Sequence, residues 1–255
     1  MTDLLVNPTV ARLTARSLLG RKRTLLLSLL PLAMLGLCTL ARILGSLDDE
    51  IAGQLQGSLS ADLLSTFGIA IMMPLLGLIA GTGSIGPEID EGSIVYLLAK
   101  PLNRYTIVVT KLLIAIGVVA GFGALPVLVS GVILTGEVGE IAVAYAVGAL
   151  AAGVGYAAVF LLLAVLTRNA VVVGLIYALV WESLVGGLVP GAQTLSIQQW
   201  ATSVIVEILG YEAELLFVES AVSFTTGLVA LVVVVLGATA YAGRRLQTLR
   251  LSDDS

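Results

Sequence analysis

Six long apolar runs constrain the fold of this 255-residue chain more than any other feature of its sequence. They lie near residues 24–44, 63–85, 105–134, 141–166, 170–189 and 221–243. A helix needs about 20 residues, each rising about 1.5 Å, to cross the roughly 30 Å hydrocarbon core of a bilayer. Charged residues make up only 12% of the chain, whereas soluble domains carry about 25%. The sequence therefore predicts an all-α membrane protein with six transmembrane helices in a domain covering residues 24–243.

Prolines fall inside three of these runs. Pro31 and Pro74 interrupt the first two, and Pro126 lies in the third, which is also unusually long and rich in glycine. Proline removes a backbone N–H group and bends a helix, and neighbouring helices can satisfy the carbonyl that it frees. We therefore expect bent spans at these positions.

The lysines and arginines are distributed unevenly between the two sides of the membrane that six crossings would create. Twelve of the 13 fall on one side: Arg12, Arg16, Arg21, Lys22, Arg23, Lys100, Arg104, Lys111, Arg168, Arg244, Arg245 and Arg250. Arg42 falls on the other side, together with acids such as Asp48, Glu137 and Glu212. Cytoplasmic loops carry the excess of basic residues. We therefore expect a multi-pass protein of the cell membrane, with residues 1–23 and the tail 244–255 both in the cytoplasm.

The amino-terminal segment carries a helix-start signal before the first span. Asn7 can cap a helix whose first residue is Pro8, where the missing N–H group costs nothing. Val10, Leu13 and Leu18 would lie toward one side of that helix, and Arg12 and Arg16 toward another. This pattern favours an amphipathic elbow helix lying at the inner membrane surface over a merely solvated basic leader.

The link between the second and third runs, "PEIDEGSIVYLLAKPLNRYTIVVTK" (residues 87–111), is unusually charged. Gly86 and Pro87 suggest a helix start, with three acids in the first turns, where the helix dipole favours them: Glu88, Asp90 and Glu91. Ile94, Leu97 and Leu98 follow at helical spacing, and Pro101 stops the helix. We therefore expect a short amphipathic helix over about 87–100 at the cytoplasmic surface. The alternative is a plain solvated loop.

These residues resemble the signature of ABC-2 type permeases, the membrane subunits of one class of ATP-binding-cassette exporters. The matching positions are Glu88, Gly92, Ser93, Leu97, Leu98, Pro101, Asn103, Arg104 and Lys111. Asn103 stands where serine is commoner. The resemblance extends to the elbow helix, the six spans and a long region before the last span, and it implies an all-α fold of the ABC-2 exporter type.

The resemblance further implies that the link is a coupling helix that docks in a groove of a separate ATPase subunit. The residues that would serve this coupling are Glu88, Glu91, Gly92, Ile94, Leu97, Leu98, Pro101, Arg104 and Lys111. The chain contains no G-x-x-x-x-G-K-S/T phosphate-binding loop, so a partner must hydrolyse ATP. We expect no cofactor in this chain, with ATP and Mg²⁺ on the ATPase, and no catalytic activity of its own. A second copy or a similar permease chain would complete the translocation path.

Glu182 is the only acid inside the fifth apolar run. Ionisable residues at membrane depth are functional candidates by default, so Glu182 could line the translocation path. Alternatively, it could face an external vestibule or a polar neighbour. The region that follows, about residues 186–220, is too polar for a span and too apolar for a free loop, and it resembles the re-entrant external helices of the same family.

Other classes of protein remain as alternatives. An ATP-independent secondary transporter or channel would more often show paired intramembrane charges or inverted repeats, and neither is evident. A membrane enzyme would need a catalytic cluster, yet the chain has no histidine and its lone Cys38 lies in an apolar run. An assembly or scaffold subunit is a further alternative. Nothing indicates nucleic-acid binding, and the apolar spans suit lipids, drugs and glycolipids alike as substrates.

Overall fold

The computed structural model describes residues 7–55, 58–90, 92, 103–185 and 191–248, and every regular element among them is helical. The first half of the chain forms α1 (Pro8–Leu18), α2 (Arg21–Gly45), α3 (Asp49–Leu55), α4 (Ser58–Leu63), η1 (Leu64–Met72), α5 (Met73–Asp90), α7 (Arg104–Val119), η2 (Ala120–Ala124) and α8 (Leu125–Thr135). The second half forms α9 (Glu140–Leu166), α10 (Ala170–Ile176), η3 (Tyr177–Val185), η4 (Ala192–Leu195), α12 (Ile197–Leu209), α13 (Tyr211–Leu215) and α14 (Phe224–Thr248). The prediction of an all-α membrane protein is confirmed.

Within the described part of the chain, five continuous helices are long and apolar enough to cross a membrane: Thr24–Gly45, Ser58–Ile89, Arg104–Thr135, Glu140–Leu166 and Phe224–Gln247. They correspond to five of the six predicted spans. The fifth predicted span, 170–189, differs. Its described part consists of seven residues of α10 and nine of η3, which rise at most about 24 Å at 1.5 Å per residue and fall short of the roughly 30 Å core.

In the described part of the chain, π-helical segments occur in three of the apolar helices, and two of these segments lie next to the prolines that predicted bends. η1 ends one residue before α5 begins with Met73 and Pro74, and η2 ends just before Leu125 and Pro126. Proline cannot donate the hydrogen bond that would continue an α-helix, and wider i→i+5 turns are a common site of helix bending. Pro31 lies within a continuous α2.

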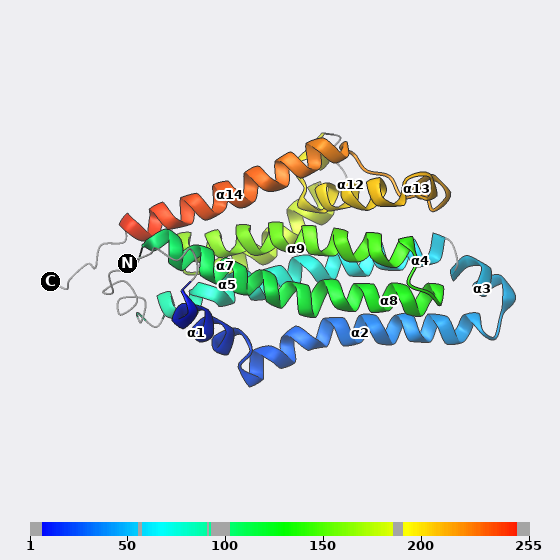
Figure 1. Ribbon diagram of the computed structural model, residues 1–255, viewed down its shortest axis with the longest axis horizontal. Helices are drawn as coiled ribbons and strands as arrows, with labels where there is room; N and C mark the ends of the chain where they lie inside the picture. Colours follow the sequence, from blue (N-terminus) through cyan, green and yellow to red (C-terminus); the bar gives the residue numbers. More distant parts are fainter. Residues whose placement is uncertain (1–6, 56–57, 91, 93–102, 186–190, 249–255) are drawn as a thin grey trace.

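α9 is the central helix of the bundle. Figure 1 shows it between α12 and α14 on one side and α5, α7 and α8 on the other. In the most apolar 18-residue stretch of α9, 61% of the residues are buried, whereas the corresponding stretches of α2 and α14 are 22% and 17% buried. Small residues permit this central position: a Cβ atom on Gly81 of α5 would lie 2.7 Å from the Ala157 carbonyl oxygen of α9. Close backbone approach at glycine is the usual way in which membrane helices pack.

The two ends of the bundle differ in what they carry. α1, the end of α5, the start of α7 and the end of α14 lie at one end, while α3, α4 and α13 lie at the other (Figure 1). α12 lies beside α9 in the half of the molecule nearer α13. Its 13 residues are too few to cross a bilayer.

Candidate functional site

A cluster of buried polar groups lies where α1, α5 and α7 meet. Its centre is Lys111 of α7, whose side chain is 0% exposed. The Lys111 Nζ atom donates to Glu88 Oε1 at 2.7 Å, to the Ser84 carbonyl oxygen at 2.7 Å and to Thr14 Oγ1 at 3.4 Å. A buried ammonium group is tolerable only when it is paired and its protons are hydrogen-bonded. Three helices distant in sequence are therefore tied together through one side chain.

The end of α5 supplies the negative side of this cluster. Ser84 and Glu88 are four residues apart, so they lie on the same face of the last two turns. Carbonyl groups at a helix C-terminus carry partial negative charge, which favours a cation there and disfavours an acid. Lys111 therefore interacts with both the carboxylate and the helix end, and it offsets the unfavourable position of Glu88.

The predicted helix start at Pro87 is wrong. Pro87 and Glu88 lie inside the last turns of α5, which continues to Asp90. Glu88 is thus at the negative end of one helix and not at the positive end of the next. α5 continues because the ion pair with Lys111 holds its last turn, while Gly92 has φ = +69°, a left-handed conformation that glycine adopts readily and that follows many helix ends.

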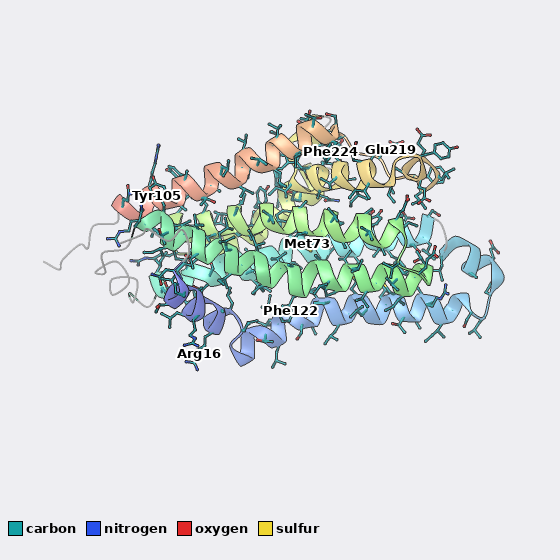
Figure 2. The ribbon with its side chains drawn as sticks, in the orientation of Figure 1. Arg16, Met73, Tyr105, Phe122, Glu219 and Phe224 are labelled. Atoms are coloured by element: carbon teal, nitrogen blue, oxygen red, sulfur yellow. The ribbon has the colours of Figure 1, made fainter. Side chains whose placement is uncertain are left out.

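α7 begins at Arg104, inside the charged segment 87–111. The Asn103 side chain accepts a hydrogen bond from the Tyr105 N–H group at 3.0 Å and so caps the helix that starts at Arg104. Figure 2 shows Tyr105 beside the last turns of α14, where a Cβ atom on Gly243 would lie 2.5 Å from Tyr105 Cδ1. The Nη1 atom of Arg104 is buried and has no hydrogen-bond partner among the residues that the structure describes.

The elbow helix α1 is anchored on α7 at two points. The Asn7 N–H group donates to Thr110 Oγ1 at 3.1 Å, and Thr14 accepts from Lys111. Asn7 also caps α1 by accepting from the Thr9 and Val10 N–H groups, as predicted.

Polarity on α1 follows the prediction with one exception. Val10, Thr14 and Leu18 are buried, whereas Arg16 points away from the helices in Figure 2. Leu13, expected beside Val10 and Leu18, is 52% exposed, because a spacing of four residues places Thr14 on the packed face instead.

Among the residues predicted to serve coupling, the structure brings Glu88 and Lys111 into contact and places Gly92 and Arg104 at the two borders of the link. Glu91, Ile94, Leu97, Leu98 and Pro101 lie outside the described residues. The sequence interpretation missed Ser84, Thr14 and Thr110. The position of Ser84 one turn before Glu88 is the signal that could have indicated it.

Glu182 of η3 occupies a second buried polar site. Its side chain is buried, and its Oε1 atom accepts from Tyr177 Oη at 3.3 Å and from the Ile197 N–H group at 3.1 Å. Its Oε2 atom accepts from the Ser196 hydroxyl group. Of the roles weighed for Glu182, this geometry matches contact with a polar neighbour, namely the start of α12. Whether it also lines a translocation path stays a prediction.

A hollow lies at the opposite end of the bundle from the Lys111 cluster. It measures about 680 Å³, and its lining includes Arg42, Glu137, Glu140 and Glu212. Arg42 Nη1 donates to the Leu134 carbonyl oxygen at 3.2 Å, so the guanidinium group covers the end of α8. Within the described part of the chain, no three His, Cys, Asp or Glu residues lie close enough together to hold a metal ion.

Comparison with known proteins adds one finding to this geometry. A family model described as "ABC-2 family transporter protein" matches residues 9–242, which include all but the first residue of α1, every helix from α2 to α13 and most of α14. No curated protein matches the chain by sequence.

Proposed function

The chain belongs to the ABC-2 family of transporter proteins, and from this premise we propose that it is the permease subunit of an ATP-driven exporter. Members of this family are the membrane components of transporters and are not themselves catalytic. Two copies, or this chain with a similar one, would enclose the translocation path. The ATPase would be a separate subunit that binds ATP and Mg²⁺, because this sequence has no phosphate-binding loop.

We assign coupling to residues 87–104, and the Lys111 cluster is the observation that supports this most strongly. The link between α5 and α7 starts and ends next to that cluster, which holds α5 to α7 and both to α1. A movement imposed on the link would therefore reach three helices together. A solvated loop that is not tied to the helices would transmit little of such a movement to them.

The energy required is considerable. Moving an inward–outward equilibrium from 1:99 to 99:1 takes about 5.5 kcal/mol of differential binding. Ile94, Leu97 and Leu98 are the apolar residues of the link that would anchor it in the ATPase groove. Burial of one leucine contributes roughly 1.5–3 kcal/mol, so two leucines supply much of what the switch requires.

The distribution of arginines favours one orientation in the membrane. α1 with Arg12 and Arg16, the start of α7 and the end of α14 with Arg244 and Arg245 share one end of the bundle (Figure 1). We assign that end to the cytoplasm of the cell by the positive-inside rule, which leaves the hollow near Arg42 outside. The ATPase would bind from the cytoplasmic end.

The experiment that tests this proposal is co-purification with the ATPase. Leu97→Asp combined with Leu98→Asp should release the ATPase and abolish substrate-stimulated ATP hydrolysis in the reconstituted complex, because two charges would enter an apolar contact. Leu47→Asp is the matched control. Leu47 is 79% exposed in the turn after α2, at the opposite end of the molecule, so this variant should keep its partner. A double variant that still binds the ATPase and still couples would contradict the assignment.

A further inference from the structure

Glu182 is a buried acid that the proposed coupling does not use. It is 4% exposed and lies in η3, within the apolar part of the chain. In the described residues no lysine or arginine forms an ion pair with it, since the ion pair found there joins Lys111 to Glu88. An unpaired buried carboxylate is costly unless hydrogen bonds stabilise it. The groups that supply these bonds therefore indicate its role.

The donors to Glu182 come from two separate elements. Tyr177 belongs to η3 itself, five residues earlier, whereas Ser196 and Ile197 form the N-cap and first residue of α12. Ser196 donates its hydroxyl hydrogen to Glu182 and accepts from the Gln199 N–H group at 3.3 Å, which uses both capacities of a hydroxyl group. The carboxylate thus lies at the positive end of a 13-residue helix, where a negative charge is favoured.

Every hydrogen bond between η3 and α12 in the described part of the chain runs through Glu182. Other elements hold α12 without involving η3. A Cβ atom on Gly155 of α9 would lie 2.9 Å from Ile197 Cγ2, and the Ala221 N–H group donates to Gln199 Oε1 at 3.0 Å. Glu182 is therefore the polar link between η3 and α12, while α9 and the turn before α14 hold α12 from other sides.

We propose that Glu182 is a positioning residue that latches α12 to η3, so that the two move as one unit. Its charge serves two separable purposes, the capping of α12 and the tether to η3, and the tether is the one that positions the helix. The significance for transport rests on the proposed function, because a displacement of η3 during transport would carry the start of α12 with it.

The test uses the full chain in lipid nanodiscs, with Cys38→Ala so that one introduced cysteine reports on α12. Ala201→Cys is the reporter, because Ala201 is 0% exposed on α12 and the substitution adds a single sulfur atom. Its rate of reaction with a water-soluble maleimide, present on both faces, measures how often α12 leaves its site. In Glu182→Ala that rate should rise about tenfold or more, since a hydrogen bond to a charged group contributes at least that factor. Glu207→Ala, which removes an exposed acid from the same helix, should leave the rate unchanged.

A second variant separates a latch from a plain helix cap. Ser196→Asp in the Glu182→Ala background places a carboxylate at the N-cap of α12, where aspartate caps as well as serine does, but it restores no tether. Fast labelling should therefore persist. Glu182→Gln, which keeps one accepting oxygen, should label at an intermediate rate and replaces Glu182→Ala if that variant fails to reach the membrane.

Two results would overturn the latch. Protection regained with Ser196→Asp would show that the acid only caps α12, and an unchanged labelling rate in Glu182→Ala or Glu182→Gln would show that α12 does not depend on it. Labelling requires neither substrate nor ATPase. A failure of the latch is therefore distinguishable from a failure of the proposed transport function.

Discussion

Lys111 and Glu88 share one ion pair but differ in exposure, and this difference makes their substitutions unequal. Lys111 is 0% exposed and Glu88 is 26% exposed. Glu88→Gln leaves a fully buried ammonium group without its counter-charge, whereas Lys111→Met leaves an acid whose side chain is partly exposed. Breaking a buried pair costs about 3–5 kcal/mol. Glu88→Gln should fall in that range and Lys111→Met below it.

Thermal unfolding of the detergent-solubilised chain measures both effects. The double variant Glu88→Leu with Lys111→Met is the control, because replacement of a whole buried pair by apolar residues is often neutral or stabilising. If the double variant is as unstable as Glu88→Gln, packing at these positions and not charge pairing determines stability. If it is stable yet uncoupled from the ATPase, the pair serves transmission.

Sequence reasoning identified both members of this pair but not their contact. A lysine inside an apolar run requires a partner, and Glu88 is one of three acids across the link, with Asp90 and Glu91. The prediction placed Glu88 at a helix start, because Gly86-Pro87 is a common start signal. The ion pair with Lys111, a tertiary interaction, overrides that local signal and lets α5 continue for another turn.

The packing of α5 against α9 depends on glycine more than on any large side chain. A Cβ atom on Gly77 would lie 2.5 Å from Tyr156 Cβ, and one on Gly81 would lie 2.9 Å from Phe160 Cβ. Gly81→Ala should therefore destabilise the fold by about 1–3 kcal/mol, the usual effect of overpacking. Gly117→Ala is the matched control, since no atom lies within 4 Å of its added Cβ, and it should be neutral or stabilise by about 0.4–1 kcal/mol. Equal melting temperatures for the two variants would show that α5 and α9 can separate without cost.

The lengths of the apolar runs predicted the five helices that, among the described residues, are long enough to span a membrane, and the described part of the remaining predicted span, 170–189, is shorter. Hydropathy counts apolar residues, but it does not register where a helix ends against a polar partner. Here Glu182, inside that run, receives hydrogen bonds from the start of α12, a tertiary contact that hydropathy does not register. Asn7, by contrast, was recognised as a cap because that signal is local.

The bundle as a whole has one basic end, and this predicts which positions an impermeant thiol reagent reaches from outside intact cells. In a Cys38→Ala background, cysteines introduced at Ser46 and Glu137 should react, because both positions are exposed at the end away from α1. A cysteine at Ser17, exposed on α1, should react only after the membrane is permeabilised. Labelling of Ser17→Cys alone in intact cells would invert the orientation.

The π-helical segments have a consequence for how this chain should be compared with its relatives. Turns closed by i→i+5 hydrogen bonds hold one residue more than α-helical turns, so each of Leu64–Met72, Ala120–Ala124 and Tyr177–Val185 can arise from an α-helix by a single-residue insertion. Alignments of homologues should therefore place one-residue gaps inside these membrane helices and not only in the loops. An alignment that forbids gaps within the spans would shift every residue beyond the π-segment by one position, and it would pair lipid-facing residues of one chain with packed residues of another.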